Sequence, residues 1–201
     1  MKAIARGEIL GLADYETVRE RFRNRVIAEK KIRRLSVGPN VSVVFENRDT
    51  VLLQIQEMLR TERITRPASV QHEIDTYNEL LPGTDELSCT LMIEIADNTQ
   101  RDAFLRAAKG LSKHVWVVAG TRRIAARSNE PSRDGSEADR TTAVHYLKFP
   151  LPNDVADALR ARAGGNGSTT ALALEIDHPA YFARADLPLE TVVAVGEDLQ
   201  A

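Results

Sequence analysis

The chain has 201 residues, 43% apolar and 28% charged, with a formal net charge of −2 and one cysteine. This composition is too apolar for general disorder, and the length suits one well-packed domain spanning residues 1–201. One cysteine excludes an internal disulfide and a zinc site of paired thiolates, and no run approaches the roughly 18 apolar residues of a membrane span, so we expect a cytoplasmic protein.

A helix is predicted over residues 14–35, ending at the sequence VGPN. Its apolar stripe, with members three to four positions apart, consists of Tyr15, Val18, Phe22 and Val26. Residues 19–34 hold eight basic residues against Glu20 and Glu29, and residues 1–66 hold 14 Lys and Arg against 9 Asp and Glu. This excess of positive charge indicates an acidic partner for the helix, or internal pairing with the acidic remainder of the chain.

The middle of the chain continues with a short strand over residues 41–46 and a helix capped by Asn47 or Asp49. Another helix is predicted from Pro67 to about Leu81. Residues 87–95 then alternate between apolar and other side chains, which is typical of a half-buried strand, and this alternation points Cys89 inward. A buried thiol of this kind is expected to be inert.

The C-terminal half is predicted to contain three helices and four strands. The helices lie at 99–110, 153–163 and within 187–199, and the strands at 114–120, 122–127, 142–151 and 169–178, the last strand of the chain. A mobile loop is expected at about 128–141. Because strands and helices do not alternate strictly along the whole chain, we expect an α+β fold, with a mixed, largely antiparallel sheet of about five or six strands flanked by helices.

Several segments together resemble one bacterial family. They are FENRDTVLLQIQEMLRTERI (45–64), KKIRRLSVGP before it, IDTYNELLPG and LSCTLMIEI after it, and the later VHYLKF and DHPAY. The chain is similar over nearly its whole length, in the same order, to the family catalogued as domain of unknown function 3501. The resemblance implies a genomic context with rubrerythrin-like diiron proteins and iron-sulfur oxidoreductases, and it implies no catalytic residues.

The helix within residues 48–63 is the first candidate site, because it carries many long polar side chains. Arg60 and Arg63 follow Gln56 by four and seven positions, which would place all three on one helix edge. Guanidinium groups one turn apart can bind a carboxylate or phosphate. The predicted ligand-binding residues are Arg48, Gln54, Gln56, Glu57, Arg60 and Arg63. The alternative is a solvated face with surface ion pairs worth under about 1 kcal/mol each.

Two histidines form the second candidate site. His145 and His178 each fall on the apolar parity of a predicted strand, so both should point inward. Antiparallel pairing of those strands would bring the imidazoles together, and with Asp177 or Glu175 they could hold a divalent metal. The alternative is that each is a hydrogen-bonded core histidine. No cofactor is required by the sequence.

The sequence therefore predicts a cytoplasmic accessory or binding protein of a redox system, using the Arg- and Gln-rich helix as its contact site. Its expected partner is an iron-sulfur oxidoreductase or a rubrerythrin-like protein, and the alternatives are a small anion or a second copy of the chain. The alternative is an enzyme acting on a small anionic metabolite, with Arg60 and Arg63 holding the substrate and Glu57 or a histidine moving the proton. The sequence does not favour a nucleic-acid partner, because few aromatic residues lie among the basic ones.

Overall fold

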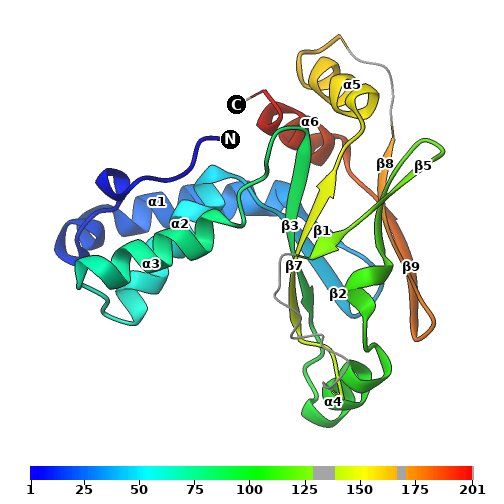
Figure 1. The fold of residues 1–201 in the computed structure, drawn as a ribbon, viewed down its shortest axis with the longest axis horizontal. Coiled ribbons are helices and arrows are strands. Elements are labelled where there is room, and N and C mark those ends of the chain that lie inside the picture. The colour runs from blue at the N-terminus through cyan, green and yellow to red at the C-terminus, as the bar shows by residue number, and fades with distance from the viewer. Residues whose placement is uncertain (129–138, 167–170, 201) are drawn as a thin grey trace.

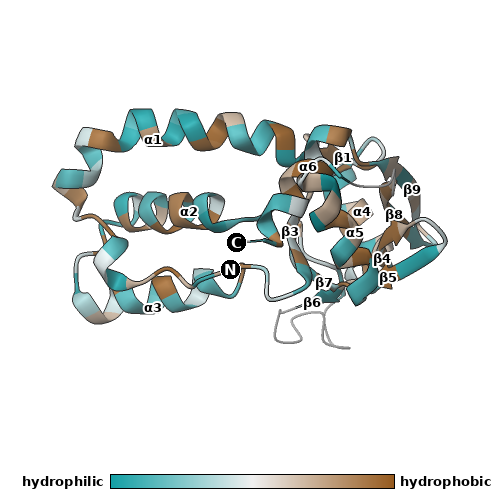
Figure 2. Cartoon of the chain, turned by 90° about the horizontal axis from the view of Figure 1, so that it is seen from above, coloured by the Kyte–Doolittle hydropathy of each residue, from teal (hydrophilic) through white to brown (hydrophobic). Residues whose placement is uncertain are grey.

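The computed structural model describes residues 1–128, 139–166 and 171–200. Its first part is a helical lobe, by which we mean the N-terminal segment 1–11 together with three helices that extend away from the sheets (Figures 1 and 2). These are α1 (Leu12–Arg33), α2 (Arg48–Thr61) and α3 (Pro67–Asn78), preceded by the short 3-10 helix η1 (Arg6–Glu8).

Nine strands among the described residues form two antiparallel sheets. The first has the order β1-β2-β3-β7-β6, with bounds Arg34–Ser36, Val41–Phe45, Glu86–Ile93, Val144–Pro150 and Arg127–Ser128. The second has the order β5-β4-β8-β9, with bounds Arg122–Ala125, Val115–Ala119, Leu172–His178 and Tyr181–Asp186. The remaining elements are α4 (Asn98–Ala107), η2 (Leu111–His114), α5 (Asn153–Ala163) and α6 (Leu189–Asp198). The expected α+β class and antiparallel pairing are confirmed, and the strands divide between two sheets.

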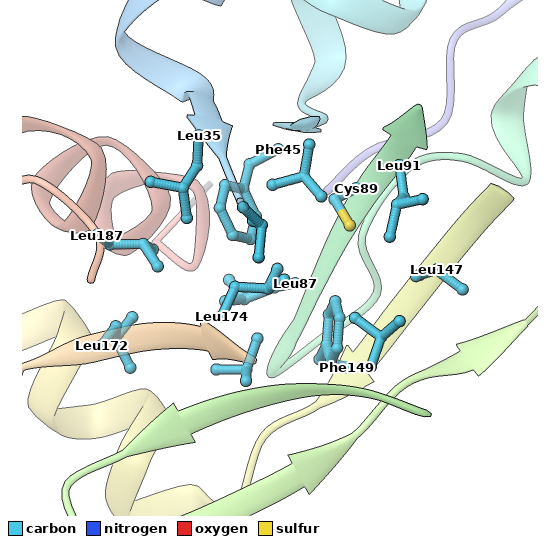
Figure 3. Close-up of a cluster of buried hydrophobic side chains, with 14 of the residues drawn as sticks. Leu35, Phe45, Leu87, Cys89, Leu91, Leu147, Phe149, Leu172, Leu174 and Leu187 are labelled. Carbon is cyan, nitrogen blue, oxygen red and sulfur yellow. The ribbon is translucent and has the colours of Figure 1, made fainter. Parts of the chain in front are cut away.

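The main core lies between the two sheets. Alternation along β3 points Leu87, Cys89 and Leu91 into it, where they meet inward residues of the other strands, including Phe149 and Leu174 (Figure 3). Cys89 is 1% exposed, and burial raises the pKa of its thiol, so the prediction of a buried, inward cysteine is confirmed.

A second cluster fills the helical lobe. Val51, Ile55 and Leu59 of α2 recur at helical spacing and pack on Val70 and Ile74 of α3. Helix α2 is capped by Asn47, one of the two predicted caps, because the Asn47 side chain accepts a hydrogen bond from the Thr50 backbone N–H at 3.0 Å. The helical lobe therefore has an apolar interior of its own.

A buried polar network joins the helical lobe to α6. The Arg33 guanidinium, on the last turn of α1, bonds both carboxylate oxygens of Asp198 at 2.5 and 3.0 Å and one oxygen of Glu29 at 3.1 Å. The Asn47 side chain donates to Glu29 as well, and the Thr191 hydroxyl bonds the carbonyl of Ile32 at 2.6 Å. The buried positive charge of Arg33 is thus balanced by the carboxylates of Asp198 and Glu29.

Three strands were not foreseen in the sequence: β1, β6 and β9. The prediction that residues 169–178 form the last strand is wrong, because β9 follows β8 through a tight turn and pairs with it from His178↔Tyr181 to Ala173↔Asp186. Much of the loop expected to be mobile, 129–138, and residues 167–170 lie outside the described residues.

Candidate functional site

An apolar groove opens on the helical lobe between the N-terminal segment, α1 and α2. Its volume is about 230 Å³ and its apolar lining comes mainly from Leu10, Tyr15, Val18, Phe22 and Leu52. The groove exists because the apolar stripe of α1 is only partly covered. Tyr15 and Val26 are buried, but Val18 is 42% exposed, and Leu10 opposite is 42% exposed too.

Two residues of the predicted site, Gln56 in the groove lining and its neighbour Glu57, are held by bonds within the protein itself. Gln56 is 2% exposed, and its side-chain amide accepts from the Leu10 N–H at 2.7 Å and donates to the Leu10 carbonyl at 3.3 Å. Glu57 accepts from the Tyr15 hydroxyl at 2.7 Å and from two nitrogens of Arg19 at 2.8 Å each. Both side chains therefore fix neighbouring segments of the chain to α2.

The protonation of Glu57 follows from these bonds. The hydrogen bond from Arg19 is the largest influence and, with the Tyr15 hydroxyl, holds the pKa of Glu57 below its usual range against the effect of desolvation. A general acid or base working near neutral pH needs the opposite shift. The environment of Glu57 gives no support to the proton transfer expected of it in the enzymatic alternative.

Two ion pairs that join separate segments involve residues of, or in contact with, the groove lining. Arg48, also a predicted site residue, bonds Glu8 at 2.5 Å and the Lys2 carbonyl at 3.2 Å. Arg25 bonds Asp49 at 2.5 Å while its guanidinium lies 5.3 Å from the centre of the Phe22 ring, which lines the groove. Charged pairs thus involve or contact residues of the apolar groove.

The expected helix edge of Gln56, Arg60 and Arg63 does not form. Helix α2 ends at Thr61, and Arg63 follows it with a left-handed backbone (φ 51°), so the seven-residue spacing no longer keeps it on the edge of Gln56. Arg60 pairs with Glu16 of α1 at 2.5 Å. Gln54 is half-buried, and its side-chain oxygen has no hydrogen-bond partner among the described residues.

Arg63 lies instead on a shallow cleft of about 630 Å³ at the turn between α2 and α3. Arg66 and His72 line the same cleft, but so do Glu62 and Glu73. The cleft therefore presents both signs of charge and is not a purely cationic site for an anion.

The two histidines point inward as predicted, with 0% of His145 and 8% of His178 exposed. The prediction that their strands pair is wrong: β7 pairs with β3 and β6, whereas β8 pairs with β4 and β9 in the other sheet. Both ring nitrogens of His178 are engaged, one by the Lys109 carbonyl at 3.0 Å and one by the Ala180 N–H at 3.1 Å. His145 lies 3.1 Å from the Thr141 hydroxyl. No group of three or more His, Cys, Asp or Glu side chains in the described parts of the chain is arranged to hold a metal ion.

A polar cluster on the outer face of the second sheet was missed by the sequence reasoning. Asp177 accepts from Arg123 at 2.6 Å and from the Trp116 indole at 2.9 Å, and His114 lies 3.3 Å away. The bond from Arg123, followed by that from Trp116, lowers the pKa of Asp177 to about 2. The sequence offered one signal for this cluster. Asp177 directly precedes the inward His178 in the same strand, so its side chain must point to the outer face of the sheet.

The basic helix α1 divides into internally paired and unpaired charges. Arg19, Arg25 and Arg33 bond acidic residues of other elements, and Arg34 in β1 lies 3.4 Å from Glu94. Within the described residues, the α1 cations that bond no acidic side chain are Arg21, Arg23, Lys30 and Lys31. The corresponding unpaired acids on α1 are Asp14 and Glu20. The charge left for a partner is therefore positive.

These features define an α+β protein with two antiparallel sheets and a helical lobe, which carries an apolar groove and, along α1, unpaired positive charges. No helix in the described residues is long and apolar enough to cross a membrane. The chain belongs to the family described as "Protein of unknown function (DUF3501)", whose model matches residues 3–199. The resemblance inferred from the sequence is confirmed.

A closely similar protein has a solved structure. It is described as a novel protein of unknown function from Burkholderia pseudomallei K96243, with 32% sequence identity and a TM-score of 0.89. The match covers 98% of this chain and 100% of the other. A search of curated proteins finds no match.

Proposed function

We propose that the protein is a binding protein that docks an acidic protein partner on its helical lobe. The observation that carries the proposal is the combination of an apolar groove lined by Val18, Phe22 and Leu52 with unpaired cations on the same helix α1. Apolar contacts supply most of the affinity of such an interface, whereas opposite charge speeds association and sets specificity.

The partner we propose is an acidic surface bearing an apolar side chain that enters the groove. The volume of about 230 Å³ is below the size of most small-molecule pockets, which favours one or two side chains of a protein over a metabolite. The redox context implied by the family suggests an iron-sulfur oxidoreductase or a rubrerythrin-like protein from the same organism. The protein would act there as an accessory subunit.

The proposal predicts that complex formation weakens when the charge of α1 is reversed. We would titrate the wild-type protein against the neighbouring iron-sulfur or diiron protein by calorimetry at low and high salt. The variant Arg21→Glu/Lys31→Glu should bind at least about tenfold more weakly at low salt, because it replaces attraction to the acidic partner by repulsion. The difference should shrink at high salt, where the Debye length falls to about 3 Å at 1 M and exposed charges are screened. Val18→Asp, which places a carboxylate on the groove wall, should abolish binding.

Lys113→Glu is the matched control, because Lys113 is exposed in η2, outside the helical lobe. It makes the same kind of charge change and should leave the affinity unchanged. A complex that is indifferent to salt, to Arg21→Glu/Lys31→Glu and to Val18→Asp would refute the proposed face. Circular dichroism of each variant verifies that the fold is retained.

A further inference from the structure

Strand β9 is an open edge of the second sheet. It is the outermost strand in the order β5-β4-β8-β9, and Figure 1 shows it at the rim of the molecule, on the side away from the helical lobe. The other edge strands, β1, β5 and β6, have 3, 4 and 2 residues, whereas β9 has 6. Short edge strands are one way in which proteins prevent edge-to-edge pairing, and β9 lacks this protection.

The direction of the backbone groups of β9 follows from one hydrogen bond. The Leu187 N–H bonds the Leu172 carbonyl at 2.7 Å, one step beyond the pair Ala173↔Asp186. In an antiparallel ladder, every second residue forms bonded pairs with the neighbouring strand. The residues bonded to β8 are therefore Tyr181, Ala183 and Ala185.

The alternate residues of β9 point their backbone N–H and C=O groups away from β8. These residues are Phe182, Arg184 and Asp186. In the described parts of the chain, no hydrogen bond to these backbone groups is present. The edge can therefore accept a further antiparallel strand without breaking an existing bond.

Side chains on the same strand favour a particular register. Phe182, Arg184 and Asp186 are exposed, and Phe182 is 77% exposed, the highest value among the large apolar residues that the structure describes. Arg184 reaches Glu175 at 3.4 Å and Asp186 at 3.9 Å, so its present ion pairs are long. Just past the strand, Leu189 is 57% exposed.

We propose that two copies of the chain associate by antiparallel pairing of β9 with β9, centred on Ala185, to give one continuous eight-stranded sheet from two sheets of four. This register places Arg184 opposite Asp186 of the second copy and, by symmetry, Asp186 opposite Arg184. It also places Phe182 opposite Pro188 of the second copy, one residue from its exposed Leu189. Pro188 has no N–H to donate, so the complete backbone hydrogen-bond pairs of this register are the two between Arg184 and Asp186.

Other antiparallel registers of this edge are less favourable in the charges that they place opposite each other. Centring the pair on Arg184 places the two guanidinium groups directly opposite each other, which is destabilising. Centring it on Ala183 leaves Asp186 opposite Ala180, without a basic neighbour in the ladder. Charge complementarity thus selects the register centred on Ala185.

The test measures the mass of the purified full-length chain by sedimentation equilibrium over a range of concentrations. The wild-type protein should be a dimer that dissociates on dilution. Arg184→Asp turns both cross-strand pairs into repulsive ones and should weaken the dimer by at least about tenfold, which corresponds to ~1.4 kcal/mol. The swapped variant Arg184→Asp/Asp186→Arg restores opposite charges across the pair and should restore dimer formation.

The swapped variant makes the result independent of general effects on folding, since it carries both substitutions and should recover the dimer. A wild-type protein that remains a monomer at its highest soluble concentration would overturn the proposal. So would a dimer that is unchanged by Arg184→Asp, because it must then use another surface. The docking proposal for the helical lobe is unaffected by either outcome.

Discussion

The buried junction at Arg33 allows a quantitative prediction about stability. The Arg33 side chain is 5% exposed and that of Asp198 is 12% exposed. Arg33→Met keeps much of the side-chain volume but leaves Asp198 beside Glu29 with no cation between them. Removing one partner of a buried ion pair costs about 3–5 kcal/mol. We expect Arg33→Met to lower the free energy of unfolding by an amount in this range. The effect should be smaller at acid pH, because a carboxyl group without its cation can take up a proton.

The control variants separate charge from packing. Urea unfolding followed by circular dichroism gives the free energy of unfolding of each protein from its midpoint and slope. The double variant Arg33→Met/Asp198→Leu should recover most of the loss, because replacing both charges by apolar groups is often nearly neutral. Arg106→Met is the matched surface control: Arg106 also bonds two carboxylates but its side chain is 51% exposed, so its midpoint should hardly change. A loss below about 1 kcal/mol for Arg33→Met, or no recovery in the double variant, would refute the reasoning.

Two further predictions concern single side chains. Cys89 should react with a neutral thiol reagent only as fast as the protein unfolds, because it is 1% exposed and burial raises the pKa of its thiol. Rapid labelling of the native protein would contradict this prediction. Asp177→Asn should lower the free energy of unfolding by a constant amount above pH ~4, and this difference from the wild-type protein should shrink as the pH falls toward about 2. The reason is that a carboxyl group with a lowered pKa in the folded state stabilises the fold only while it is ionised. Equal pH profiles for the variant and the wild-type protein would show that the Asp177 bonds contribute nothing.

Local signals in the sequence predicted most elements because they depend on near neighbours. The helical spacing in α1 and α2, the Asn47 cap and the strand alternation of β3 are all visible within a few residues. Alternation also predicted the inward direction of Cys89, His145 and His178, which the structure confirms. Strand β9 was missed because its inward positions include Ala183 and Ala185, which give only a weak apolar signal.

The partners of the polar residues could not be predicted in the same way. Arg33 and Asp198 are 165 positions apart, and Arg19 and Glu57 are 38 apart, so no periodicity connects them. The assignment of β7 and β8 to different sheets likewise depends on tertiary packing, which left the pairing of the histidine strands open to error. The long polar side chains of α2 were read as a site for a ligand, but Gln56, Glu57 and Arg60 bind segments of the same chain.

The two proposed surfaces are compatible because they lie on different parts of the molecule. The groove belongs to the helical lobe, whereas β9 is the outer strand of the sheet on the opposite side (Figure 1). Pairing through β9 would therefore leave both grooves of a dimer open. A dimer of this kind could bind two copies of an acidic partner, or one symmetric partner at two points, and the second contact would then form at a high effective concentration. Weak docking at each groove would then be sufficient for a stable assembly. Arg184→Asp should therefore weaken binding to a dimeric partner, and it should leave the affinity for a monomeric partner unchanged.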